Sequence, residues 1–210
     1  MRSLPSLVVA LSLAAAPVLA YPTSLNLIPS ADVMDARTVR VALELDGHAT
    51  PFSEDAGLYL CTQFGVTDRL EIGFDLNEIN YDSDWAVNAK WQVVPENDST
   101  PAVAIGVWDA TRWGALSDWY VVASKDAGNC RLHGGFRHNG PNRGFVGAEY
   151  FVTDRFEFMA DWTTGHDEYL AGGAFYDLGH GLGTFAYYAR SNSTRDGDFV
   201  GLNAVWEGPW

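Results

Sequence analysis

Apolar and polar residues alternate along Phe64–Leu76, FGVTDRLEIGFDL, which has a polar turn, VTDR, near its start. Leu70, Ile72, Phe74 and Leu76 are apolar, and the residues between them are acidic or glycine. Successive side chains of a β-strand point to opposite faces, so this period of two predicts a strand with one apolar and one polar face. The apolar positions before the turn continue the same face, which predicts a hairpin.

This hairpin pattern recurs 86 residues later in Tyr150–Trp162, YFVTDRFEFMADW. Six of the thirteen positions are identical, including the four turn residues and two acidic residues. Glu71 and Asp75 of the first copy therefore correspond to Glu157 and Asp161 of the second. A repeated hairpin with one wholly apolar face requires an environment that covers that face, which is either a protein core or lipid.

The same alternation predicts twelve strands joined as an up-and-down antiparallel meander. The predicted strands are Arg37–Asp46, Gly57–Val66, Arg69–Asn77, Trp85–Val94, Ala102–Asp109, Asp118–Lys125, Cys130–His138, Gly144–Val152, Arg155–Thr163, Glu168–Asp177, Leu182–Arg190 and Phe199–Trp206. Short connections alternate with longer polar ones, as in transmembrane β-barrels whose short turns are periplasmic. We therefore predict an all-β fold, a single transmembrane barrel with both termini on the short-turn side.

Alternation alone does not distinguish this barrel from a soluble exported sandwich or a lipocalin-like barrel whose apolar faces point inward. Two observations favour the membrane barrel. Strands of about nine to eleven residues match a tilted crossing of the hydrocarbon layer. Small residues are also frequent on the polar face, as a confined lumen requires: Gly73, Ala86, Ala104, Gly106 and Gly135.

The N-terminus, MRSLPSLVVALSLAAAPVLA, has one early arginine, an apolar run and small residues at its end. These features predict a signal peptide, residues 1–20, cleaved after Ala20 and followed by a barrel domain, residues 21–210. The formal net charge of −14 argues against nucleic acid as a partner. Cys61 and Cys130 fall in predicted strands that lie far apart, so we expect free thiols, with a disulfide as the alternative.

Aromatic residues cluster near the ends of the predicted strands, where amphipathic rings favour a membrane interface. They are Trp85, Trp108, Trp119, Trp162, Tyr188, Trp206 and Trp210. With its signal peptide, alternating strands and aromatic C-terminus, the chain resembles bacterial outer-membrane β-barrel proteins, and its VTDRLEIGFDL hairpin is similar to those of small porin-like barrels. Trp210 stands where that family has phenylalanine, and Gly208 and Pro209 interrupt the alternation before it. The resemblance implies an outer-membrane location, contact with the lipid bilayer and lipopolysaccharide, and insertion by the barrel-assembly machinery.

Charged and polar side chains on the predicted inner face are the candidate lumen residues. They are Arg40, Glu44, Asp46, Glu71, Asp75, Asn88, Lys90, Gln92, Arg131, His133, Arg137, Glu149, Glu157, Asp161 and Arg190. They could line a water-filled pathway for a small polar solute. Alternatively they could pair across the lumen and close it, since buried charges are costly when unpaired. Within this set we expect Glu149 to neutralise Arg131 or Arg137, and Lys90 to lie near Glu71 or Asp75.

The favoured function is passive, porin-like passage of a small polar solute through this charged lumen. A structural or interaction barrel with a closed lumen, supporting the envelope or the assembly of an exported polymer, is the alternative. A third possibility is an outer-membrane lipid hydrolase, which would require Ser124 or His133 to face lipid. We expect no catalytic residues, no cofactor and no metal, because the acidic loop clusters lack the spacing of a cation site.

Overall fold

The computed structural model describes residues 24–49, 56–77, 84–108, 110, 118–193 and 197–210 of the chain. The predicted signal peptide, residues 1–20, lies outside the described residues. The twelve predicted strands are present, with ends within three residues of those expected. They are β1 (Thr38–His48), β2 (Gly57–Thr67), β3 (Leu70–Asn77), β4 (Asp84–Val94), β5 (Ala102–Trp108), β6 (Asp118–Ala127), β7 (Cys130–His138), β8 (Asn142–Thr153), β9 (Phe156–Thr163), β10 (Tyr169–Gly179), β11 (Leu182–Ser191) and β12 (Phe199–Pro209).

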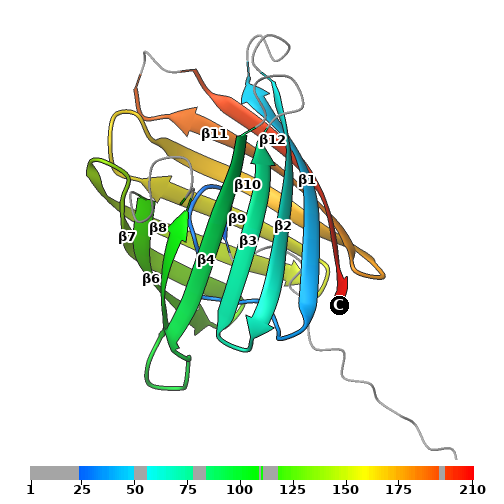
Figure 1. Ribbon diagram of the computed structural model, residues 1–210. Coiled ribbons are helices and arrows are strands. Elements are labelled where there is room, and N and C mark those ends of the chain that lie inside the picture. The colour runs from blue at the N-terminus through cyan, green and yellow to red at the C-terminus, as the bar shows by residue number, and fades with distance from the viewer. Residues whose placement is uncertain (1–23, 50–55, 78–83, 109, 111–117, 194–196) are drawn as a thin grey trace, which may run out of the picture.

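Each strand pairs antiparallel with its neighbours in sequence, and β12 pairs with β1 to close the barrel (Figure 1). The closing strand continues three residues beyond its expected end at Trp206, through Gly208 to Pro209, which lies opposite Thr38. Beyond it, the Trp210 backbone N–H donates to the Arg37 carbonyl oxygen at 3.0 Å. Closure gives the strand backbones partners on both sides, as lipid demands.

The outer surface of the barrel is apolar. In β9, buried and exposed side chains alternate along the strand, and the exposed ones are apolar or aromatic. Exposed large apolar side chains from all around the wall include Leu43, Leu60, Phe74, Leu76, Trp91, Ile105, Val121, Leu132, Val146, Phe158, Leu170 and Leu202. Such an outward apolar band suits contact with lipid and excludes the soluble alternative with its apolar face inside. Among the described residues no helix is long and apolar enough to cross a membrane.

The two copies of the repeated hairpin, β2–β3 and β8–β9, have the same local geometry. Each has a register shift just before its turn. In each, the threonine hydroxyl of the turn, Thr67 or Thr153, accepts the backbone N–H of the following arginine at 3.2 Å. Because β3 and β9 are six strands apart in a closed barrel of twelve, the repeats stand on opposite walls.

Residues 24–36 enter the lumen from the short-turn rim, and we call them the plug segment. In Figure 1 this segment is the blue coil inside the barrel. Leu25, Ile28, Ala31 and Met34 are all buried there. The tip of the segment is a tight turn, in which the Leu25 N–H donates to the Ile28 carbonyl at 2.9 Å. The sequence analysis assigned no structure to these residues, so the plug segment is an addition to the predicted fold.

Of the aromatic residues expected at strand ends, one points inward. Trp108 packs against the buried ring of Tyr120 with ring centroids 5.0 Å apart, so its placement at the interface was wrong. The others are exposed large aromatics at or near strand ends: Trp85, Trp119, Trp162, Tyr188, Trp206 and Trp210. Both cysteines are free, as expected. Cys61 shares the inner face with its strand partner Asp75, whereas Cys130 lies opposite the exposed Tyr150 on the outer face.

Candidate functional site: the plugged lumen

The predicted lumen charges lie on the inner face, with one exception. Buried ones are Arg40, Glu71, Lys90, Arg131, His133, Glu149, Glu157 and Asp161, while Glu44, Asp46, Asp75 and Arg137 are half-buried. The polar residues Asn88 and Gln92 also face inward from β4. Arg190 was placed wrongly, since it is exposed and its neighbour Ala189 occupies the inner position. Strand β11 is apolar or aromatic on both faces, so alternation could not fix its phase.

Asp161 holds the tip of the plug segment. One oxygen of its carboxylate accepts the backbone N–H and the side-chain amide of Asn26, at 3.0 and 2.7 Å. The same oxygen accepts the Leu27 N–H at 3.3 Å. A buried carboxylate is costly unless hydrogen-bonded, and these three donors replace the hydration that this one oxygen of Asp161 loses.

The middle of the plug segment is held by three side chains of β4 and β6. Lys90 donates to the Ser30 carbonyl at 3.1 Å, and its ammonium lies 3.4 Å from the Glu71 carboxylate, as expected for this pair. The amide of Gln92 donates to the Ala31 carbonyl at 2.9 Å. Two strands farther along the wall, the Ser124 hydroxyl on β6 accepts the Ala31 N–H at 2.7 Å. The barrel wall thus takes up backbone groups that no secondary structure satisfies.

An ion-pair network fixes the plug segment near the short-turn rim. The guanidinium of Arg131 makes two parallel bonds to Asp32, at 2.8 and 2.6 Å. It also contacts Glu96, at 2.7 Å, and Asp126. Burial by itself raises the pKa of Glu96, but the Asp126 N–H, Lys125 and Arg131 outweigh it and lower the pKa to about 2. The paired, planar geometry makes this the strongest anchor of the plug segment.

Two glycines make room for the plug segment. A β-carbon at Gly147 would lie 2.7 Å from side-chain carbons of both Ile28 and Leu25. A β-carbon at Gly65 would collide with the carbonyl oxygen of Asp35, where the chain bends into the lumen. A larger residue at either position would displace the segment, so the wall is shaped to receive it.

The expected pairing of Glu149 with an arginine is wrong. Although Arg131 and Glu149 are register partners on β7 and β8, the guanidinium extends instead to the acidic groups of the plug segment and the turns. Arg137 pairs with Glu168 at 2.5 Å. Glu149 lies 3.6 Å from the Nε2 atom of His133. Long arginine side chains reach carboxylates beyond their register partner, which strand pairing alone cannot predict.

Ser124 and His133 both face the lumen and are buried. The Ser124 hydroxyl lies 2.8 Å from His133 Nδ1, and it also accepts the Ala31 N–H. The hydrolase hypothesis requires Ser124 or His133 to face lipid, and neither side chain does. Their contacts tie the plug segment to the wall.

A second part of the lumen, on β1 and β3, is acidic. Glu44 is repelled electrostatically by both Asp46 and Asp75. Asn88 donates a hydrogen bond to Asp75, and Arg40 on the same wall pairs with Glu207 at 2.5 Å. The plug segment is held by Lys90, Gln92, Ser124, Arg131 and Asp161, and on β3 by Glu71, whose carboxylate accepts the Met34 N–H.

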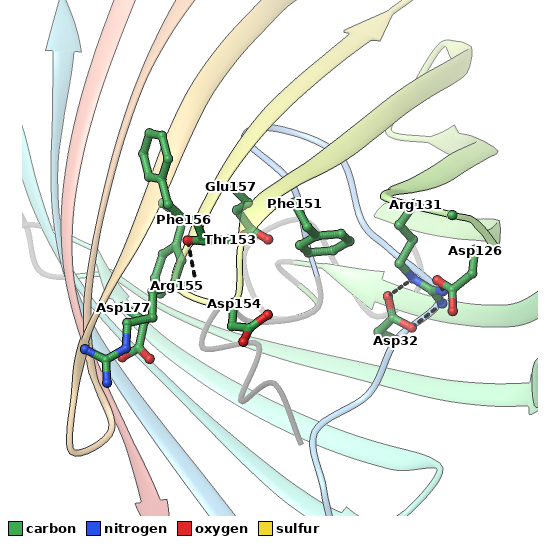
Figure 2. A pocket seen from close by; sticks show the side chains of 12 residues that line it. Asp32, Asp126, Arg131, Phe151, Thr153, Asp154, Arg155, Phe156, Glu157 and Asp177 are labelled. Atoms are coloured by element: carbon green, nitrogen blue, oxygen red, sulfur yellow. Dashed lines mark hydrogen bonds and ion pairs between the residues drawn. The ribbon is translucent and has the colours of Figure 1, made fainter. Parts of the chain in front are cut away.

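A cavity of about 370 Å³ opens at the short-turn rim, next to the plug segment (Figure 2). Its lining residues come from β6 to β10, their turns and the plug: Asp32, Asp126, Gly128, Arg131, Phe151, Thr153, Asp154, Arg155, Phe156, Glu157, Phe175 and Asp177. Carboxylates outnumber guanidinium groups in this set. In the described part of the chain, no group of three or more histidine, cysteine or acidic residues could hold a metal ion.

A closed antiparallel barrel of twelve strands, apolar outside and polar inside, defines a β-barrel of the outer-membrane class. The fold is similar to that of the KdgM porin, with a TM-score of 0.57, 6% identity and coverage of 80% of this chain and 98% of that one. It is also similar to Omp33 of Acinetobacter baumannii, with a TM-score of 0.56, 12% identity and coverage of 82% and 98%. A KdgM porin in complex with disordered oligogalacturonate gives a TM-score of 0.53, at 7% identity and coverage of 80% and 98%.

A comparison of the sequence with family profiles identifies the family of this chain. A family profile described as "Exopolysaccharide biosynthesis protein YbjH" matches residues 62–175, more than half of the chain. The chain therefore belongs to this family. No curated protein matches it.

Proposed function

We propose that this protein is a porin-like channel for a small polar solute and that the plug segment closes it at rest. The observation that carries this proposal is the plug segment itself. A lumen that admits a peptide segment in cross-section also admits a small solute once the segment moves. The wall binds the segment through hydrogen bonds and ion pairs, which water and a hydrated solute can replace.

The charges of the lumen favour a neutral or cationic solute. Glu44, Asp46 and Asp75 form an acidic wall, and Arg131 is already shared among three carboxylates. An anion would be repelled from such a lining. A porin of the same fold is described with an oligogalacturonate, which is an anionic saccharide, and the family description refers to exopolysaccharide. Both point to saccharides, while the acidic wall of this lumen disfavours the anionic ones. We therefore favour a neutral or amino-bearing saccharide as the solute.

A non-conducting barrel is the second candidate, and the many contacts of the plug segment favour it. In that case the charges would serve stability only, and the barrel would support the envelope or the assembly of an exported polymer. The two candidates differ in one property, which is whether removing the plug segment produces a conducting pore.

The test is single-channel current in planar bilayers under a salt gradient. We expect the wild type to conduct rarely, and a variant lacking residues 24–34 to conduct in discrete, cation-selective steps. Asp161→Asn, which weakens the hold on Asn26 and Leu27, should raise the open fraction about tenfold. Asp98→Asn, which changes an exposed carboxylate on the β4–β5 turn, is the matched control and should behave as the wild type.

A reversible disulfide between the plug segment and the barrel wall gives a second test of the channel. Ala31→Cys with Ser124→Cys, in a background of Cys61→Ser and Cys130→Ser, places two thiols where a hydrogen bond of 2.7 Å now joins these residues. Oxidation should silence the channel and reduction should restore it. If the plug-deleted protein still shows heat-modifiable gel mobility but carries no current, the channel proposal is wrong and the non-conducting barrel is supported.

A further inference from the structure

Glu157 occupies an unusual position at the short-turn end of β9. Its strand partners are Phe151 on β8 and Phe175 on β10, so an acidic side chain stands between two phenylalanines on the inner face. Glu157 is only 6% exposed and lines the cavity of about 370 Å³. Figure 2 shows its carboxylate directed toward the Phe151 ring.

The Glu157 carboxylate has neither a hydrogen bond nor an ion pair within the described residues. Glu149, which is also negative, repels this carboxylate electrostatically. Arg131 lines the same cavity but already binds Asp32, Glu96 and Asp126. An unpartnered carboxylate that is nine-tenths buried is costly, and a cation in the cavity would relieve that cost.

The repeat explains which ligand chemistry is missing. Glu71 is the equivalent of Glu157 on the opposite wall, and it has both an ammonium, from Lys90, and a backbone N–H, from Met34, as donors. The register partner of Glu71 on β4 is Lys90, whereas that of Glu157 on β10 is Phe175. The strand next to the first hairpin thus supplies a cation to its glutamate, whereas the strand next to the second hairpin supplies an aromatic ring.

We propose that this cavity binds a small organic cation, whose ammonium group contacts Glu157 and whose carbon skeleton packs against Phe151 and Phe175. A carboxylate combined with aromatic faces is the chemistry that recognises such cations. Asp177 and Asp154 at the rim add negative potential that attracts a cation from the short-turn side. An anion is repelled by the carboxylates of this lining, and an uncharged apolar ligand gains only the contact with its phenylalanine rings.

The volume limits the size of the ligand. About 370 Å³ lies at the lower end of the range, roughly 300–1,000 Å³, that is usual for small-molecule sites. A single amino-bearing sugar ring fits this limit, and it agrees with the family description. Binding here does not depend on whether the lumen conducts, so the site stands apart from the proposed channel.

The test is calorimetric titration of the detergent-solubilised, folded protein with glucosamine, with the neutral N-acetylglucosamine as the ligand control. We expect saturable binding of glucosamine and at least tenfold weaker binding of N-acetylglucosamine. Glu157→Gln should weaken glucosamine binding about tenfold or more. Phe151→Leu keeps an apolar side chain but removes the ring, and it should weaken binding about threefold to tenfold.

Asp98→Asn removes a carboxylate from another turn on the same rim and should leave the affinity unchanged. Equal weakening by Asp98→Asn and Glu157→Gln would mean that only general negative charge is at work, and it would overturn the site. Equal binding of the two sugars, or failure of the wild type to bind glucosamine at all, would overturn it as well. Heat-modifiable gel mobility confirms that each variant is folded.

Discussion

The hairpins β2–β3 and β8–β9 carry the same turn and the same two carboxylates, yet their inner faces differ. Glu71 and Glu157 are each the second residue of an eight-residue strand, on opposite walls of the barrel. Glu71 binds Lys90 and the plug segment, while Glu157 faces a cavity. Farther along the strands the roles change: Asp161 binds the plug tip, and Asp75 accepts a bond from Asn88 on the neighbouring strand.

One position accounts for much of this difference. Gly65 in the first hairpin leaves space for the Asp35 carbonyl, and the chain enters the lumen past it. The equivalent residue in the second hairpin is Phe151, whose ring lines the cavity instead. The repeated sequence therefore determines where each carboxylate lies along its strand and that it faces the lumen. The residues around it determine whether the carboxylate binds the plug segment or faces a cavity.

The largest effect is expected from exchanging these two residues. Gly65→Phe should force the plug segment away from the rim, because even a β-carbon there collides with Asp35. We expect a loss of about 4 kcal/mol or more in the free energy of unfolding. Phe151→Gly, the reciprocal change, only enlarges an existing cavity and should cost less. Urea unfolding in detergent measures both, and equal losses would show that the hairpins are not distinguished by the entry of the chain.

The next largest effect concerns the equivalent glutamates. Glu71→Gln leaves the buried ammonium of Lys90 without its carboxylate and should destabilise the protein by about 3 kcal/mol. Glu157→Gln removes a charge that has no partner and should change stability by less than about 1 kcal/mol, or raise it. The same urea experiment compares them. A larger loss for Glu157→Gln would mean that its carboxylate is satisfied in solution.

The smallest effect is a pH dependence at the rim. Glu96 has a pKa of about 2 in the folded protein, below its ordinary value of 4.5. Its stabilising contribution is therefore complete above about pH 4.5 and is lost as the pH falls toward 2. Since the Glu96 side chain lies close to solvent, we expect its contribution to the free energy of unfolding to be less than about 1 kcal/mol.

Thermal melting from pH 5.5 to pH 2 measures this contribution as the difference between wild type and Glu96→Gln. That difference should be present at the upper pH and vanish at the lower one. A difference that stays constant across the range would show that the charge of Glu96 does not stabilise the anchor of the plug segment.

The alternation of apolar and polar residues predicted most of the barrel, because every strand that crosses a bilayer must turn one apolar face to lipid. The number of strands, their ends and the inner position of most charges followed from it. The phase of β11 did not, because Phe185, Tyr187 and Tyr188 make both faces aromatic. The Lys90–Glu71 pair was within reach because the two residues are register partners.

The plug segment could not be predicted from alternation, because it has no regular structure of its own. Its one signal was a set of apolar residues, Leu25, Leu27 and Ile28, between the predicted signal peptide and the first strand, with no strand face to occupy. Its partners, such as Arg131 and Asp161, were identified as lumen residues, but their bonds to the segment depend on where the chain turns inward. Only the folded lumen determines that.

The two free cysteines have a consequence for biogenesis. Cys61 lies on the inner face of the wall and Cys130 on the outer face, on strands five apart. The two thiols therefore cannot form a disulfide in the folded barrel. An exported chain crosses the periplasm unfolded, and that compartment oxidises thiols. A disulfide formed in transit would hold β2 against β7 and prevent the strands from taking their order. Efficient assembly therefore requires that both thiols remain reduced until the barrel separates them, and closure of the wall then makes that separation permanent.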